Sequence, residues 1–338
     1  MRRLMLLMAC SAIWLSGCGG NGNDGGAAPS EAVGTDAPGA KESASPANGE
    51  RGERMSAEKI VQSLLDGKYD EVYGLTSEAF RQEIAPGPFL EAVTAFGEGV
   101  TEWKPNTSMA LNGGEYSTWT DQDGNRGLLL FMDGEGTITG IQFVPLERYP
   151  ETDDRPTGLA YAAPFRGEWL VFWGGQDVLA NYHYEHPSQR YAYDFVQAKD
   201  GFSYSGDATL NESYYAFGQE ALAPQDGTVA LVVNDIPDNA PVGTVNPDEP
   251  AGNLVVLDHG NGEYSFLAHL KEGSVRVKAG DRVNKGDPVG LIGNSGNSSE
   301  PHLHFHIGDS SDLFSGTSIR VHWESGLDPL QGTMMIGK

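Results

Sequence analysis

The segment that most constrains the fold is a short alternating run near the C-terminal end of the sequence. Residues 302–307 read His-Leu-His-Phe-His-Ile. Because successive side chains of a β-strand point to opposite faces, this spacing predicts a strand with imidazoles on one face and apolar side chains on the other. A solvent-facing polar strand is the alternative interpretation. The register of His302, His304 and His306 on one face favours a metal site.

The sequence around this strand is typical of a β-protein. From residue 161 onward, short apolar segments alternate with turns, and the chain contains 45 glycines. No long helical period occurs there, so the pattern predicts an antiparallel β-sandwich or open barrel over residues 161–338. The expected strands lie at 169–173, 191–196, 227–233, 253–258, 264–269, 288–293 and 302–307.

An earlier segment, residues 55–145, has a different pattern. Helical spacing occurs around Ile60, again from about Ser77, and a third time around Phe89. Four expected strands follow, at 108–111, 115–120, 126–132 and 138–145. This order predicts a small α+β domain and resembles cystatin-like or nuclear-transport-factor-like domains. We expect residues 146–160 to be a linker and residues 55–145 to be a spacer or a binding site for a cell-wall protein partner.

The N-terminus has the pattern of an export signal. Arg2 and Arg3 precede a short apolar run that is too short to span a bilayer and ends in Leu-Ser-Gly-Cys18. This resembles a bacterial lipobox, which implies a signal peptide at 1–17 and a membrane anchor through lipidated Cys18. An ordinary secretory peptide is the alternative, and both imply an extracytoplasmic protein. Residues 18–54 are rich in small and polar residues and predict a disordered tether.

Charge and cysteine content exclude several classes of function. The formal net charge is −25 at pH 7, so nucleic acid and anionic lipid headgroups would be repelled. The chain has 2 cysteines, Cys10 inside the expected leader and Cys18 at its end. No disulfide or cysteine-based metal site can form in the mature folded part, so any metal must be held by histidines and carboxylates.

Four segments together resemble one family. They are Gln189–Phe195, Ala268-His269-Leu270, the turn Val277–Gly286, and the run Gly293–Phe305 that ends in Pro-His-Leu-His-Phe. In this order they are similar to the lysostaphin-type zinc metallopeptidases, over most of residues 160–330. The resemblance implies a compact antiparallel β-fold with a groove over a single Zn²⁺. It also implies Asp194 and His304 as zinc ligands, and His269 and His302 as the catalytic pair.

The third zinc ligand is assigned from a less direct resemblance. Many members of the family place a histidine four residues before the aspartate, where this chain has Arg190. One branch carries the histidine further upstream in an Asn-x-His segment, which implies His183. His186 is the alternative, since the ligand chemistry alone accepts either residue.

These residue types suit hydrolysis. Two neutral imidazoles and a carboxylate leave zinc with an open position and a net positive charge, which lowers the pKa of a bound water. His302 or His269 is then expected to move the proton. The resemblance implies a zinc endopeptidase that cuts peptide stems or cross-bridges of peptidoglycan; the alternative is a non-catalytic scaffold that activates other wall hydrolases. We expect His259 to be structural and His306 to lie behind the ligands or at the rim. The acidic segment 235–250 is a candidate lid.

Overall fold

The computed structural model describes residues 55–338. The predicted signal peptide at 1–17, the lipidated Cys18 and the tether at 18–54 lie outside the described residues. Within the described range, no helix combines the length and the apolar character needed to cross a membrane.

The N-terminal part is a layer of helices on an antiparallel sheet. Helices α1 (Ala57–Leu65), α2 (Tyr69–Gly74), α3 (Glu78–Glu83) and α4 (Pro86–Gly97) precede strands β1 (Trp103–Leu111), β2 (Gly114–Asp121), β3 (Arg126–Asp133) and β4 (Ile138–Pro145). The strands pair in sequence order. Side-chain oxygens of Ser56 and Ser77 cap α1 and α3, as expected at helix N-termini. The three expected helices and the four expected strands are confirmed; α2 was not predicted.

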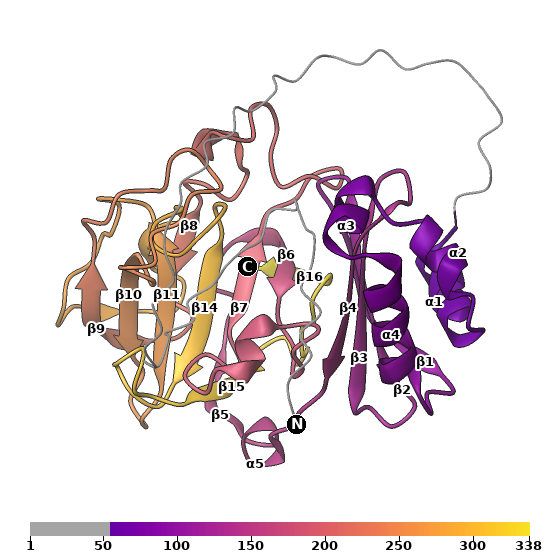
Figure 1. The fold of residues 1–338 in the computed structure, drawn as a ribbon. Helices are drawn as coiled ribbons and strands as arrows, with labels where there is room; N and C mark the ends of the chain where they lie inside the picture. Colours follow the sequence, from indigo (N-terminus) through magenta and orange to yellow (C-terminus); the bar gives the residue numbers. More distant parts are fainter. Residues whose placement is uncertain (1–54) are drawn as a thin grey trace.

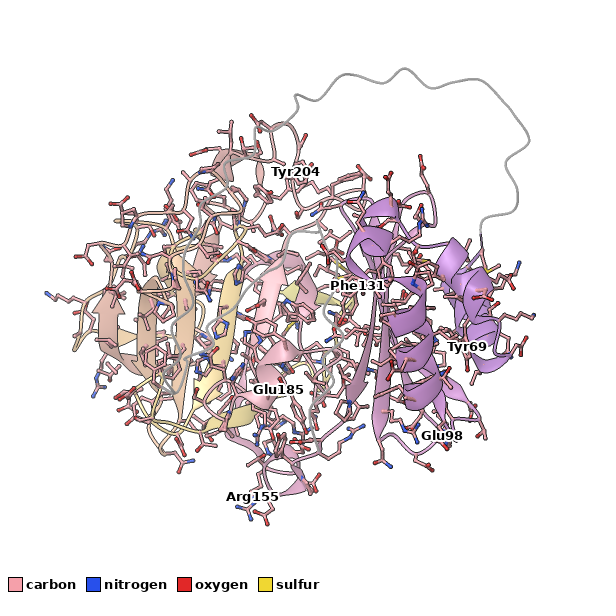
Figure 2. All side chains as sticks on the ribbon, in the orientation of Figure 1. Tyr69, Glu98, Phe131, Arg155, Glu185 and Tyr204 are labelled. Atoms are coloured by element: carbon pink, nitrogen blue, oxygen red, sulfur yellow. The ribbon has the colours of Figure 1, made fainter. Side chains whose placement is uncertain are left out.

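The sheet is buried on both faces, which the alternation of β3 explains. Leu128 and Leu130 pack under the helices, whereas Leu129 and Phe131 belong to a second apolar cluster that also contains side chains from beyond residue 146. Figure 1 shows the helices on one side of this sheet and the C-terminal strands on the other. Figure 2 shows Phe131 at the junction. The two parts therefore share this second apolar cluster.

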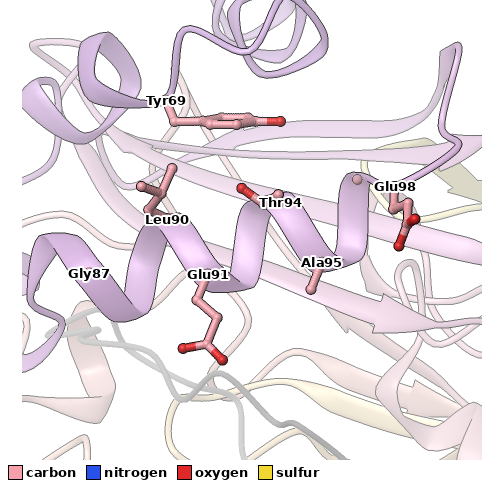
Figure 3. Close-up of a pocket in the computed structure, with 8 residues that line it drawn as sticks. Tyr69, Gly87, Leu90, Glu91, Thr94, Ala95 and Glu98 are labelled. Atoms are coloured by element: carbon pink, nitrogen blue, oxygen red, sulfur yellow. The ribbon is translucent and has the colours of Figure 1, made fainter.

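The helical side carries a surface groove of its own. A hollow of about 770 Å³ lies between Tyr69 of α2 and the exposed side of α4. In Figure 3 the Tyr69 ring lies above α4, with Leu90 facing it and Glu91 pointing away. This groove is on the opposite side of the N-terminal sheet from the C-terminal strands.

The C-terminal part is built on a ten-stranded sheet. Its main path runs β12 (Arg282–Val283), β9 (Gly227–Val233), β10 (Asn253–Asp258), β11 (Tyr264–Leu270), β14 (Leu303–Gly308), β7 (Tyr193–Val196), β6 (Gly167–Trp173) and β16 (Met334–Gly337). β15 (Ser318–Trp323) branches from β14 and pairs with β5 (Pro156–Tyr161), while β8 (Glu220–Leu222) and β13 (Pro288–Leu291) form a separate ribbon. Short helices α5 (Pro150–Asp153), η1 (Tyr182–Glu185) and η2 (Asn211–Ser213) complete it.

The predicted antiparallel β class is confirmed. The pairing of β5 with β15 is the parallel exception among the strand pairs described. The expected linker at 146–160 contains α5 and most of β5. The Glu263 carboxylate accepts hydrogen bonds from the backbone of Gly158 and Leu159 and from the Tyr161 hydroxyl, which holds β5 in place.

Strand β14 lies inside the sheet between β11 and β7. Its apolar side chains Leu303, Phe305 and Ile307 are fully buried in the main core, as the alternation predicted. Burying a large apolar side chain contributes about 1.5–3 kcal/mol relative to exposure, so this face fixes the strand firmly. The opposite face of β14 carries the imidazoles.

Candidate metal centre

The centre of the candidate site is formed by strand pairing between β14 and β7. The register places His304 directly opposite Asp194. The Nδ1 atom of His304 lies 3.0 Å from Oδ1 of Asp194, and both side chains are buried. Two residues that are 110 positions apart in the sequence are thus adjacent because two strands pair.

The third member comes from the turn η1. The Nε2 atom of His183 lies 3.7 Å from Oδ2 of Asp194. His183, Asp194 and His304 each offer one ligand atom, and these atoms lie within 4.8 Å of one another. The set of two imidazoles and one carboxylate is one that zinc accepts.

Asn181 fixes the ring of His183. Its Oδ1 lies 2.8 Å from Nδ1 of His183, so this nitrogen is the protonated one. The Asn181 amide donates to the carbonyls of Gly175, Arg190 and Ala192, and the residue is fully buried. The Nε2 lone pair of His183 therefore points towards Asp194. Asn181 had no predicted role, although its place two residues before His183 was an available signal.

Buried polar atoms of this cluster are left without hydrogen-bond partners. Nε2 of His183 and Oδ2 of Asp194 are both in this state. Leaving one such group unpaired costs about 1–3 kcal/mol, so native proteins keep few of them. A cation between these atoms would satisfy both at once, and the donor set therefore fits Zn²⁺.

The protonation states also suit a metal ion. Burial lowers the pKa of His183 to about 3, although nearby Asp194 acts in the opposite direction. Burial raises the pKa of Asp194, but the adjacent His183, His302 and His304 lower it more, and the net pKa lies below the usual value. At neutral pH His183 is neutral and Asp194 ionised, which are the forms that bind metal.

Two further imidazoles face the cluster, each anchored through one nitrogen. Nδ1 of His269 on β11 lies 2.8 Å from the carbonyl of Ser295, and Nδ1 of His302 lies 2.9 Å from the carbonyl of Glu300. Their ring centroids are 4.7 Å apart, and Nε2 of His302 is 3.6 Å from Oδ1 of Asp194. Both Nε2 atoms are buried without a partner. Burial lowers the pKa of both rings, so both are neutral at neutral pH and keep a lone pair on Nε2.

The backbone at His269 is unusual. Its φ is +58°, in the left-handed region that non-glycine residues rarely adopt. Such conformations persist only where the surroundings enforce them, and they are enriched at functional sites.

The two alternatives for the upstream ligand lie in different places. His183 is in the cluster, whereas His186 is only half-buried and outside it. Arg190 occupies the position where many lysostaphin-type peptidases have a histidine. Its guanidinium lies 3.4 Å from the ring centre of Tyr149, and its Nε donates to the carbonyl of Tyr184. Arg190 therefore ties the segment after η1 to the residues before α5.

The remaining histidines have supporting contacts. Nδ1 of His306 lies 3.1 Å from Nε2 of His304, and the His306 ring stacks on Phe266. His306 is buried, so it lies behind His304, and the alternative of a rim position is wrong. His259 is held by the carbonyl of Asp226 and the hydroxyl of Ser265, which agrees with a structural role.

The acidic segment 235–250 packs on the loop that leads into β14. The Asn239 amide donates to the carbonyls of Gly296 and Ser298, both at 2.8 Å. The backbone nitrogen of Asn246 donates to Gly296 as well. The segment therefore braces the approach to His302; its role as a lid stays a prediction.

Comparison with known proteins gives a family match for part of the chain. Residues 213–314 match the model of peptidase family M23. The peptidoglycan DD-endopeptidase ShyA of Vibrio cholerae is 42% identical over 57 residues, which are 17% of this chain and 13% of that protein. The murein hydrolase activator EnvC of Escherichia coli is 38% identical over 56 residues, again 17% of this chain and 13% of the relative. The aligned stretches thus span a small part of the relatives' length.

Among solved structures, lysostaphin from Staphylococcus simulans is 21% identical and covers 38% of this chain and 39% of its own, with a TM-score of 0.24. The family match includes His269, His302 and His304 but not His183 and Asp194. Two of the three clustered side chains therefore come from outside the matched stretch. What the comparisons establish is that residues 213–314 carry the sequence pattern of peptidase family M23.

Proposed function

We propose that this protein is a zinc-dependent endopeptidase that cleaves peptide stems or cross-bridges of peptidoglycan. The observation that carries the proposal is the buried cluster of His183, Asp194 and His304, in which Nε2 of His183 and Oδ2 of Asp194 lack partners. The match of residues 213–314 to a peptidase family supports the same reaction class.

Each side chain of the cluster has a proposed role. His183, Asp194 and His304 would hold Zn²⁺, and Asn181 keeps His183 in the tautomer that leaves Nε2 free for it. When bound, zinc supplies a Lewis acid that polarises a peptide carbonyl and lowers the pKa of water from 15.7 to about 7.

His269 and His302 are the proposed proton-transfer pair. Their Nε2 atoms face the cluster and are unpartnered, while their Nδ1 atoms are held by backbone carbonyls. One neutral ring accepts a proton from the attacking water through Nε2 and returns it to the leaving amine. Once protonated, the ring also stabilises the negative charge that develops on the carbonyl oxygen.

The substrate and location rest on further observations. The relative ShyA is named a peptidoglycan endopeptidase. The export signal and the lipobox-like Cys18 support an extracytoplasmic protein that is anchored to a membrane of the bacterial envelope. Residues 55–145 are a second proposed contact, to a cell-wall protein.

Metal content and cleavage test the proposal together. Purified wild-type chain is expected to contain one zinc per molecule and to release soluble peptides from isolated peptidoglycan, and chelation should stop the release. His304→Ala should lose both zinc and activity. His322→Ala is the matched control, because His322 is exposed on β15 and outside the cluster. Activity that survives His304→Ala or chelation would exclude the zinc mechanism.

A non-catalytic scaffold is the second candidate, because the relative EnvC is named a murein hydrolase activator. Under that hypothesis the wild-type chain would release no peptides by itself but would stimulate a purified wall hydrolase. The enzyme is favoured because His269 and His302 are buried beside the cluster of His183, Asp194 and His304.

A further inference from the structure

A cavity of about 470 Å³ lies where the N-terminal sheet meets the C-terminal part. Side chains from the turn between β1 and β2, from β3 and from the start of α3 line one side. Phe172 of β6 and Glu300 line the other. Figure 2 shows Phe131, one of the lining residues, between the two parts of the molecule. The cavity therefore exists because the N-terminal sheet packs here.

Glu300 is the unusual residue of this cavity. Its side chain is only 2% exposed, and Oε1 has no hydrogen-bond partner. Burial raises the pKa of this carboxyl to about 7, and a hydrogen bond with the side chain of Ser203 acts against that shift. A buried carboxylate oxygen without a donor is costly, so a ligand that brings a donor would be favoured.

The walls indicate which donor fits. Leu111, Phe131 and Phe172 make much of the surface apolar, and Glu115 and Asp133 add two more carboxylates. None of the described residues that line the cavity is Lys, Arg or His. Anions would be repelled, whereas an ammonium group on an aliphatic stem would pair with carboxylate and bury its methylene groups.

Glu300 also contacts the proposed catalytic machinery. Its backbone carbonyl lies 2.9 Å from Nδ1 of His302, and Glu300 also belongs to the lining of the cavity. A side chain bound at Glu300 would therefore contact the same residue whose carbonyl orients His302.

We propose that this cavity is a specificity subsite that binds the primary ammonium group of a lysine-type side chain of the peptide substrate, with the Glu300 carboxylate as its acceptor. The assignment of the ligand to the substrate rests on the proposed peptidase function. Both parts of the molecule form the subsite, since the N-terminal sheet supplies one wall and Glu300 supplies the charge. It gives the N-terminal part a direct role in substrate choice.

Binding tests the subsite independently of catalysis. The full chain carrying His304→Ala is titrated with fluorescent Ala-Ala-X-Ala peptides, where X is lysine, Nε-acetyl-lysine or norleucine, and anisotropy is recorded. The lysine peptide is expected to bind about tenfold more tightly than the other two, as for one charge-assisted hydrogen bond of about 1.4 kcal/mol. Adding Glu300→Gln should reduce lysine binding to the norleucine level.

Two further variants keep the test decisive. Glu212→Gln removes the same charge at an exposed position outside the cavity and should leave the tenfold preference intact. Ala79→Trp, on the exposed side of α3 at the cavity wall, should weaken lysine binding without touching Glu300. Equal binding of lysine and norleucine peptides, or an equal loss in Glu212→Gln and Glu300→Gln, would overturn the subsite. Because no cleavage is measured, a failed peptidase assay would leave this result standing.

Discussion

The two larger sheets of the molecule bury polar side chains in opposite ways. On the N-terminal sheet, the Thr118 hydroxyl accepts from the backbone nitrogen of Thr107, and the Thr107 hydroxyl donates to Gln331 of the C-terminal part. Within residues 55–145, no buried side-chain nitrogen or oxygen lacks a hydrogen-bond partner. Around β14, by contrast, buried imidazole and carboxylate atoms remain unpaired. The first arrangement stabilises a fold, and the second retains a cost that a ligand can remove.

The largest expected effect is a loss of proton transfer without a loss of metal binding at the candidate metal centre. His269→Asn and His302→Asn should each lower kcat about 10²–10⁴-fold, the usual contribution of a general acid–base group, with zinc content unchanged. Asparagine tolerates the positive φ at position 269, so the backbone is preserved there. Single-turnover peptide release and metal analysis on the same sample give both values. Loss of zinc in either variant would reassign that histidine as a ligand.

The alternating strand β14 shows how much of the site a local sequence pattern can predict. The period of two was enough to predict the apolar and imidazole faces of β14, because side-chain direction depends only on neighbouring residues. The resemblance of the motifs supplied Asp194 as a partner of His304. The register that places them opposite each other is a long-range property of strand pairing, which no local pattern encodes.

Tertiary context also decided what the sequence did not predict. Most of β5 lies in the expected linker, because its strand conformation depends on pairing with the distant β15 and on the Glu263 carboxylate. Glu300 had no signal of its own, since its burial comes from a fold in which the N-terminal sheet packs beside it. Predictions thus held where one strand or helix decides the outcome.

The second prediction concerns Asn181, which is fully hydrogen-bonded and lies beside the metal cluster. Asn181→Ala should weaken zinc binding about 10–100-fold, as expected when the partner that orients a metal-binding histidine is lost. It should also lower the free energy of unfolding by about 1–3 kcal/mol, because the carbonyls of Gly175, Arg190 and Ala192 lose their donor. Competition with a chromophoric chelator and urea unfolding measure the two effects. Unchanged zinc affinity would show that His183 needs no fixed tautomer.

The third prediction uses pH to measure the cost of burying the Glu300 carboxyl. The pKa of Glu300 rises from 4.5 to about 7 on folding, so its neutral form is stabilised. That contribution is full below pH 4.5 and is lost as the pH rises through about 7. Glutamine has no proton to lose. Relative to wild type, Glu300→Gln should therefore gain about 2 kcal/mol of unfolding free energy between pH 5 and pH 8.

Urea unfolding of both metal-free chains at pH 5 and pH 8 measures this difference, since the titration of the buried histidines is common to both. Glu212→Gln serves again as the exposed control and should show no such gain. A constant difference between wild type and Glu300→Gln across this range would mean that folding does not raise the pKa of this carboxyl.

The smallest expected effect concerns the hydrogen-bonded polar groups of the N-terminal sheet. Thr118→Val keeps the shape of the side chain but removes the acceptor of the Thr107 backbone nitrogen and one partner of the Thr107 hydroxyl. The free energy of unfolding should fall by about 1–2 kcal/mol, because a buried donor is left unpaired. Zinc content and peptide release should be unchanged, since the N-terminal sheet supplies no atom to the metal cluster. Lower peptide release at full zinc content would instead mean that the junction of the two sheets transmits packing changes to the catalytic histidines. Stabilising polar groups and functional polar groups would then no longer belong to separate sheets.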